Sequence, residues 1–128
     1  MDVKWFSGAD RDLSRLRFYS EVNFGKETAI KIVLSVRQTI GLLSQFPNLG
    51  PLEPLLGHRQ EAWRSLVIHR NVKVIYLIGT HTVNIAALWD TRQNSARLAN
   101  YFDNVIEAEP SILSEPPVPY IKVNKTDK

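Results

Sequence analysis

Two helical patterns follow one another in the first third of the chain, and the short link between them restricts how they can be arranged. In residues 26–46, apolar side chains fall on one helical stripe: Ala29, Ile32, Val33, Val36, Ile40 and Leu43. The preceding segment repeats the same spacing with Leu13, Leu16, Tyr19 and Val22. Ser7 and Asp10 have the spacing of a capping box, and Asn23 to Gly25 suits a helix end. Because almost nothing joins the two helices, they must form an antiparallel hairpin.

Strand patterns dominate the next part of the chain. Residues 47–61 are punctuated by proline and glycine and predict a loop. Runs rich in Val, Ile, Leu, Tyr and Trp then predict strands at residues 62–70, 72–78 and 82–89, with connections short enough for hairpins. Asp2 to Phe6 predicts a short edge strand, and a third helix begins at Asn94 or Ser95 and ends before Pro110.

These elements predict an α+β fold. We expect an N-terminal helix hairpin packed on a mainly antiparallel four-stranded sheet, with a short C-terminal helix and an extended tail. The expected core contains Ile32, Val36, Ile40, Val74, Tyr76 and Ile85. With 128 residues and 44% hydrophobic content, the chain has room for one core. Residues 1–109 are expected to form this domain and residues 110–128 a proline-containing tail.

Composition excludes several chemistries. The sequence has no cysteine, so it offers no disulfide, thiolate zinc site or thiol nucleophile. The three histidines, His58, His69 and His81, are too scattered to indicate a metal site, and no cofactor is expected. No basic and apolar leader pattern opens the chain, and no apolar run approaches the ~18–20 residues of a membrane span. We therefore expect a cytoplasmic protein.

The net charge of +3 is unevenly distributed. Residues 57–97 carry only two acidic side chains, Glu61 and Asp90, against six basic ones: Arg59, Arg64, Arg70, Lys73, Arg92 and Arg97. Residues 100–128 are weakly acidic. A cationic centre of this kind can neutralise phosphates or meet an acidic protein partner. A solvated strand face is the alternative interpretation.

Strand alternation separates the basic residues from the core. In residues 72–78, Val74 and Tyr76 share one face and Lys73 points to the other. We expect the first face to lie beneath the helices, so that Lys73, Arg64 and Arg92 could converge on an uncovered face. Alternatively, Lys73 extends over a half-open sheet and the arginines pair with Glu61 or Asp90.

Several segments together resemble the RelE/ParE family of toxins from bacterial type II toxin–antitoxin modules, over roughly residues 3–100. They are Gly50 with Glu53-Pro54-Leu55, Trp63-Arg64-Ser65-Leu66, Lys73-Val74-Ile75-Tyr76, and Trp89-Asp90-Thr91-Arg92-Gln93. The resemblance to the RelE branch implies a ribosome-dependent endoribonuclease that cuts mRNA without metal. In that reaction the ribose 2′-hydroxyl attacks the adjacent phosphate, which requires a base, cations and an acid.

The resemblance also implies roles for individual residues. Glu53 matches a loop that carries a carboxylate base, while Lys73 and Arg92 match arginines that act on the phosphate. This gives Glu53, Lys73 and Arg92 as catalytic candidates and Arg64, Lys73 and Arg92 as RNA-binding candidates. Lys73 lacks the bidentate fork of an arginine. Active ribonucleases of the family use a Tyr or His near the C-terminus as the acid. In this sequence the tyrosine nearest to that place is Tyr101. The implied partners are a cognate antitoxin, the ribosome and mRNA.

Two other functions fit the same resemblance. ParE-branch members share the fold, lack the ribonuclease residues and poison DNA gyrase through protein contacts, and a degenerate member would only bind its antitoxin. The placement of the four candidates distinguishes the first two functions. A cluster of Glu53, Arg64, Lys73 and Arg92 around one phosphate would support RNA cleavage, whereas scattered positions would support gyrase binding.

Overall fold

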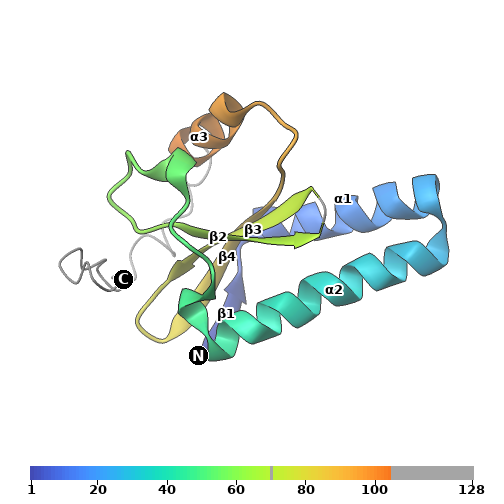
Figure 1. Ribbon diagram of the computed structural model, residues 1–128, viewed down its shortest axis with the longest axis horizontal. Helices are drawn as coiled ribbons and strands as arrows, with labels where there is room; N and C mark the ends of the chain where they lie inside the picture. Colours follow the sequence, from blue (N-terminus) through green and yellow to red (C-terminus); the bar gives the residue numbers. More distant parts are fainter. Residues whose placement is uncertain (70, 105–128) are drawn as a thin grey trace.

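The computed structural model describes residues 1–69 and 71–104, and it contains the expected helix hairpin (Figure 1). Helix α1 spans Ser7–Phe24 and helix α2 spans Lys26–Gln45. Gly25 alone separates them, with a φ of 97° that side chains rarely permit. The glycine therefore lets the chain reverse direction in one residue, and the antiparallel hairpin is confirmed.

The expected capping box at the start of α1 is wrong. Phe6 occupies the N-cap position and makes no side-chain capping hydrogen bond, while Ser7 is already the first helical residue. The Phe6 carbonyl accepts a hydrogen bond from the Asp10 amide at 3.1 Å. Phe6 is instead fixed by burial, since only 2% of its surface is exposed. The helix thus starts where an aromatic side chain enters the core.

The sheet has four strands in the order β1-β4-β3-β2. The strands are β1 (Asp2–Trp5), β2 (Arg64–His69), β3 (Val72–Ile78) and β4 (Thr82–Asp90). Strand β1 lies at one edge and runs parallel to β4, whereas β2, β3 and β4 form an antiparallel meander. The sheet is therefore mixed but mainly antiparallel, as expected from the sequence.

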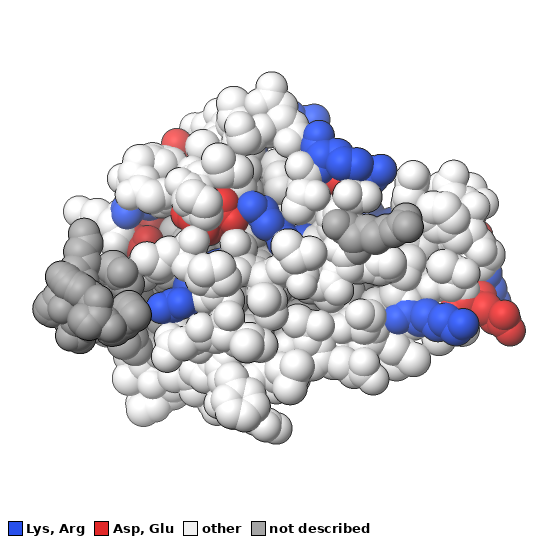
Figure 2. Space-filling model, in the orientation of Figure 1, with Lys and Arg blue, Asp and Glu red and all other residues white. Residues whose placement is uncertain are grey.

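Charged side chains are sparse along the outer surface of α2 (Figure 2). In this view they gather at the end of the hairpin, near the turn between the helices, and the rest of the helix presents uncharged atoms.

The hairpin extends beyond the sheet (Figure 1). As a result, Tyr19 and Val22 of the apolar pattern in α1 are half or more exposed, although Leu13 of the same pattern is buried.

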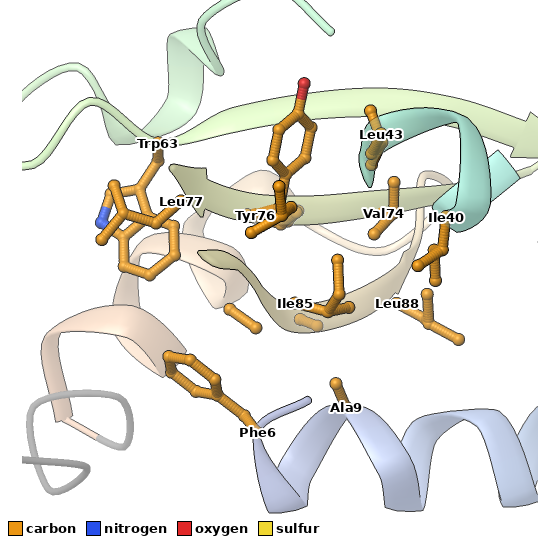
Figure 3. Close-up of a cluster of buried hydrophobic side chains, with 14 of the residues drawn as sticks. Phe6, Ala9, Ile40, Leu43, Trp63, Val74, Tyr76, Leu77, Ile85 and Leu88 are labelled. Carbon is orange, nitrogen blue, oxygen red and sulfur yellow. The ribbon is translucent and has the colours of Figure 1, made fainter. Parts of the chain in front are cut away.

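The expected core is confirmed, because Ile32, Val36, Ile40, Val74, Tyr76 and Ile85 are all buried. Val74 lies next to Leu43 and Ile40 of α2 in Figure 3, and Tyr76 extends from β3 to the same side. This places the helix hairpin on the face of the sheet that strand alternation indicated.

The opposite face of the sheet is covered over β3, where Ile75 and Leu77 are buried, whereas Val67 on the edge strand β2 is 61% exposed. The expectation of an uncovered face is therefore wrong for β3. Helix α3 (Ser95–Asn104) packs there together with the segment that precedes β2. Trp63 lies beside Leu77 (Figure 3) and meets Phe102 of α3 edge to face, with ring centroids 4.8 Å apart. Two short 3₁₀ helices, η1 (Pro47–Leu49) and η2 (Pro54–Leu56), interrupt the expected loop. The helix hairpin covers the apolar side chains on one face of β3, and α3 with the segment before β2 covers those on the other face.

The predicted tail, residues 110–128, lies outside the described residues, as does the end of the third helix pattern. In the described part of the chain, no helix combines the length and apolar character needed to cross a membrane.

Candidate functional site

Glu53 is a buried carboxylate that forms an ion pair with the partly buried Lys73. The Lys73 Nζ atom donates a hydrogen bond to Glu53 Oε1 at 2.6 Å. The side chain of Glu53 is 1% exposed and that of Lys73 is 15% exposed. The structure therefore brings these two sequence-predicted residues together, with the Glu53 carboxylate buried and paired to a lysine that is partly exposed.

Glu53 is positioned by a short segment that runs alongside β2. The Glu53 amide donates to the Trp63 carbonyl at 2.8 Å, and the Ser65 amide donates to the Pro51 carbonyl at 3.0 Å. Between them, Leu52 pairs with Arg64 as an isolated bridge. Side chains alternate across such a ladder, so Glu53 lies on the same face as Ser65 and Lys73.

Opposing effects act on the Glu53 carboxyl group. Burial raises its pKa, but hydrogen bonds from Lys73, Ser65 and the Leu55 amide lower it by more, so the pKa of Glu53 lies below its ordinary value. The Leu55 amide donates to Glu53 Oε2 at 3.0 Å, and this bond caps η2. Glu53 is thus held ionised as part of a hydrogen-bonded network.

Arg64 lies on the other face of the sheet. It pairs directly with Tyr76 across β2 and β3, and Tyr76 belongs to the face beneath α2. The Arg64 Nη1 atom donates a hydrogen bond to the Gly50 carbonyl at 2.7 Å, and the Gly50 amide donates one to Tyr76 Oη at 2.9 Å. A side chain at Gly50 would place its Cβ 2.5 Å from the Ser65 carbonyl oxygen. Glycine therefore allows the loop to approach β2 closely, and Arg64 holds it there.

Arg92 is separate from both groups. It follows the end of β4, and its Nη2 and Nε atoms donate to the Asp90 carboxylate at 2.8 and 3.0 Å. These hydrogen bonds lower the pKa of Asp90. The pairing agrees with the alternative in which an arginine pairs with Asp90. The expected convergence of Arg64, Lys73 and Arg92 on one face is wrong, because the strand register sends Arg64 and Lys73 to opposite faces and Arg92 lies beyond the strand.

The sequence was compared with models of known protein families. The model described as the ParE toxin of the type II toxin–antitoxin system parDE matches residues 3–95. The chain belongs to this family. A solved structure titled "Chromosomal ParDE TA system from P. aeruginosa" is similar in fold, with a TM-score of 0.60 and 23% sequence identity. That similarity covers 70% of this chain and 95% of the other chain. No curated protein matches the sequence.

Tyr101, the tyrosine considered as an acid, belongs to α3 of this ParE-family chain. Its ring packs against Trp89 with a centroid distance of 6.1 Å. Gly8 of α1 lies so close that a Cβ atom there would be 2.6 Å from Tyr101 Oη. Tyr101 therefore takes part in the packing between α1, α3 and β4. Among residues 1–69 and 71–104, no cluster of three or more His, Cys, Asp or Glu side chains could hold a metal ion.

A groove between α1 and the end of β4 was not anticipated from the sequence. It encloses about 470 Å³ and is lined by residues that include Asp12, Tyr19, Leu88, Asp90 and Arg92. Strand β1 ends at Trp5, opposite Ile85, so β4 continues beyond its neighbour. There the Leu88 amide donates to Asp12 Oδ2 at 3.1 Å, and burial raises the pKa of Asp12.

One sequence signal could have located this groove. Asp12 falls within the apolar stripe of α1, between Ala9 and Leu16. A carboxylate in such a position needs a partner on the element that the helix covers. The Leu88 amide, on the part of β4 that extends beyond β1, is that partner.

Proposed function

We propose that this chain is a toxin that acts by binding a protein target, DNA gyrase, and not by cleaving mRNA. The observation that carries this proposal is the burial of the Glu53 side chain, which is 1% exposed and pairs with Lys73 at 2.6 Å. A general base must reach the substrate hydroxyl, and Glu53 is enclosed by its own protein. This favours the gyrase-directed alternative over the ribonuclease that the sequence first suggested.

The remaining candidates support the same proposal. RNA cleavage requires preorganised positive charge around one phosphate. Arg64 is bound to the Gly50 carbonyl on one face of the sheet, Lys73 lies on the other face, and Arg92 pairs with Asp90. A scattered arrangement of this kind fits a protein-binding toxin, in which these residues maintain the fold.

Membership of a toxin–antitoxin family implies an antitoxin partner, and we place its docking site in the groove between α1 and β4. The groove combines apolar walls, such as Leu16 and Leu88, with charged groups, such as Arg15 and Asp90. An amphipathic segment would match this pattern, with its apolar side against the sheet edge. Antitoxin binding there would leave the Glu53–Lys73 pair untouched.

The target is tested by inducing the full chain in a bacterial host. We expect growth arrest with double-strand DNA breaks and an SOS response while messages stay intact, together with inhibition of purified gyrase by the purified chain. Coexpression of the antitoxin should restore growth. Messages cut within minutes of induction, with replication continuing, would instead support the ribonuclease.

Paired substitutions separate the two mechanisms inside the protein. Glu53→Gln combined with Lys73→Met removes both charges, retains similar volumes and keeps a side-chain oxygen that can accept the hydrogen bond from the Leu55 amide. Arg92→Ala changes a side chain that is 62% exposed and should leave the fold intact. We expect both variants to remain as toxic as the parent chain. Loss of toxicity in folded protein, checked by circular dichroism, would show that these residues take part in the activity.

A further inference from the structure

The edge of the sheet beside α1 is open over the second half of β4. Strand β1 pairs with β4 only as far as Trp5 and Ile85, and the Phe6 amide, which donates to the Ile85 carbonyl at 2.9 Å, extends that ladder by one hydrogen bond. Strand β4 continues to Asp90. In the described part of the chain, no strand pairs with residues 86–90 on that side. We call residues 86–90 the open edge.

The strand register shows which backbone groups the open edge presents. The Leu88 amide donates to Asp12 Oδ2 at 3.1 Å and therefore points away from β3. Leu88 lies opposite Val74 of β3. In an antiparallel pair, a residue directs its amide and its carbonyl to the same side, so the Leu88 carbonyl also points outward, as does the Asp90 amide two residues on. A row of outward-pointing groups is a template on which a strand of another chain can pair.

Asp12 of α1 lies against the middle of the open edge and lowers stability there. Its side chain is 23% exposed, and burial raises its pKa by more than the Leu88 hydrogen bond and the nearby arginines lower it. Arg15 is 3.9 Å from the carboxylate and 76% exposed, so this pair contributes little. A raised pKa means that the ionised carboxylate is less favourable in the folded chain than in the unfolded chain. Stability therefore does not explain the position of Asp12.

An identical open edge is a partner that each copy of the chain meets whenever the protein is present. Hydrogen bonding between strands uses the backbone, so it requires no matching side-chain sequence. Two open edges placed antiparallel about Leu88 could satisfy each other through a two-fold axis. The same arrangement would bring the Asp12 carboxylates of both copies together and would require each Leu88 amide to release Asp12.

We propose that Asp12 closes the open edge of β4 and thereby prevents a second copy of this chain from pairing with it. The carboxylate accepts the hydrogen bond of the Leu88 amide that an added strand would need, and it places a negative charge beside the edge. Charged side chains that point inward at a sheet edge protect proteins from edge-to-edge association, and proteins give up stability for such protection. The groove beside β4 is thus left free for the antitoxin that we place there.

The proposal is tested by sedimentation equilibrium of the full chain across a concentration series. We expect the parent chain to stay monomeric, and Asp12→Ala to dimerise with an association stronger by roughly tenfold or more. Asp12→Leu removes the same acceptor and extends the apolar stripe of α1, so it repeats the test in a second variant. The matched control is Asp10→Ala, which removes an exposed carboxylate from the same helix. Thermal melting checks that each variant folds.

The conservative variant separates the hydrogen bond from other effects of the substitution. Asp12→Asn keeps a side-chain oxygen that can accept from the Leu88 amide, so it should stay monomeric. Amide exchange then locates the association: in Asp12→Ala, exchange at Leu88 should slow as the protein concentration rises. Exchange at Val67, on the edge strand at the other side of the sheet, should not change.

Four results would overturn the proposal. The first is that Asp12→Ala and Asp12→Leu fold and remain monomeric. The second is a parent chain that already dimerises with protection of the Leu88 amide. The third is a dimer of the alanine variant in which exchange at Leu88 does not slow, because the interface would then lie elsewhere. The fourth is an asparagine variant that associates as strongly as the alanine variant, because the hydrogen bond would then not close the edge.

Discussion

Glu53 connects three parts of the molecule through one carboxylate. It accepts hydrogen bonds from Lys73 on β3 and from the Leu55 amide in η2, and Ser65 on β2 also bonds to it. Removing two charges from water costs several kcal/mol per ion, and the hydrogen bonds offset that cost. We infer that the pair fixes the position of the segment beside β2, since either charge alone would be buried without a partner.

The ion pair predicts a specific pH dependence of stability. The pKa of Glu53 is lower in the folded chain than its unfolded value of about 4.3. The resulting stabilisation is present above the unfolded pKa and is lost as the pH falls through the folded pKa. The free energy of unfolding, measured with urea between pH 5 and 3, should therefore decrease more steeply in the parent than in Glu53→Gln/Lys73→Met.

Other carboxylates titrate in both proteins and act as an internal control. The depressed pKa of Asp90 and the raised pKa of Asp12 contribute slopes of opposite sign, but neither residue is altered in the comparison. Parallel curves for the parent and the double variant would mean that Glu53 is not stabilised in its ionised form.

At the scale of elements, the loop between α2 and β2 is anchored by one side chain of the sheet. Tyr76 on β3 donates a hydrogen bond to the Pro47 carbonyl at 2.7 Å and accepts one from the Gly50 amide at 2.9 Å. Pro47 is the first residue of the short helix η1, and Gly50 directly follows its end. The sheet thereby holds the irregular segment that leads to Glu53.

Tyr76→Phe should destabilise this anchor. Deleting the hydroxyl leaves the Gly50 amide without its partner in a buried position, which costs about 1–3 kcal/mol. Denaturant unfolding should show a decrease of that size, and amide exchange at Gly50 should accelerate. Tyr19→Phe is the control, because Tyr19 is half exposed on α1. Equal stability of the two variants would argue against an anchoring role.

The sequence predicted the elements better than their surroundings. Periodicity located the helices and strands to within about two residues because it depends on local alternation. It did not reveal that both faces of β3 are covered, since alternation orients side chains without showing what packs on them. The available sequence signals were the apolar side chains of Ile75 and Leu77 on the second face of β3 and the apolar stripe of Leu98 and Phe102.

The candidate site was predicted least well. Glu53 and Lys73 are 20 residues apart. Their contact depends on the pairing of Leu52 with Arg64 of β2, in a segment that follows Pro47 and Pro51. Nothing in local spacing determines such a register. Arg64 and Lys73 are nine residues apart on adjacent strands, and only the turn between β2 and β3 decides whether they share a face. The bulge between Val67 and His69 lies close to that turn.

At the scale of the whole molecule, α3 is held against the segment that precedes β2 by an arginine clamp. Arg59 is 7% exposed, and its guanidinium donates to Glu61 Oε1 and Asp103 Oδ1, both at 2.8 Å, and to the Phe102 carbonyl at 3.3 Å. Glu61 Oε1 also accepts a hydrogen bond from Trp63 Nε1 at 3.0 Å. The clamp thus joins the last described helix to the segment that covers the second face.

Removing the clamp should loosen α3 selectively. Arg59→Ala removes the charge-assisted hydrogen bonds to Glu61 and Asp103 together, so it should accelerate amide exchange in α3 at least tenfold. Exchange in the middle of β3 and β4 should change far less, because those strands remain covered by the hairpin. Arg59→Lys, which keeps the charge without the fork, should fall between the two. Uniform acceleration across the chain would mean that α3 does not open by itself.

The parallel pairing of β1 with β4 has a consequence for biosynthesis. Asp2 is the partner of Thr82, and Trp5 is the partner of Ile85. Strand β1 can therefore pair only after β4, the last strand of the sheet, has been synthesised. At about 5–20 residues per second, translation needs on the order of 10 s to supply that partner. The hairpin can form earlier from local contacts, but the groove beside β4 cannot. The nascent chain therefore acquires the groove beside β4 only when its sheet has been almost entirely synthesised.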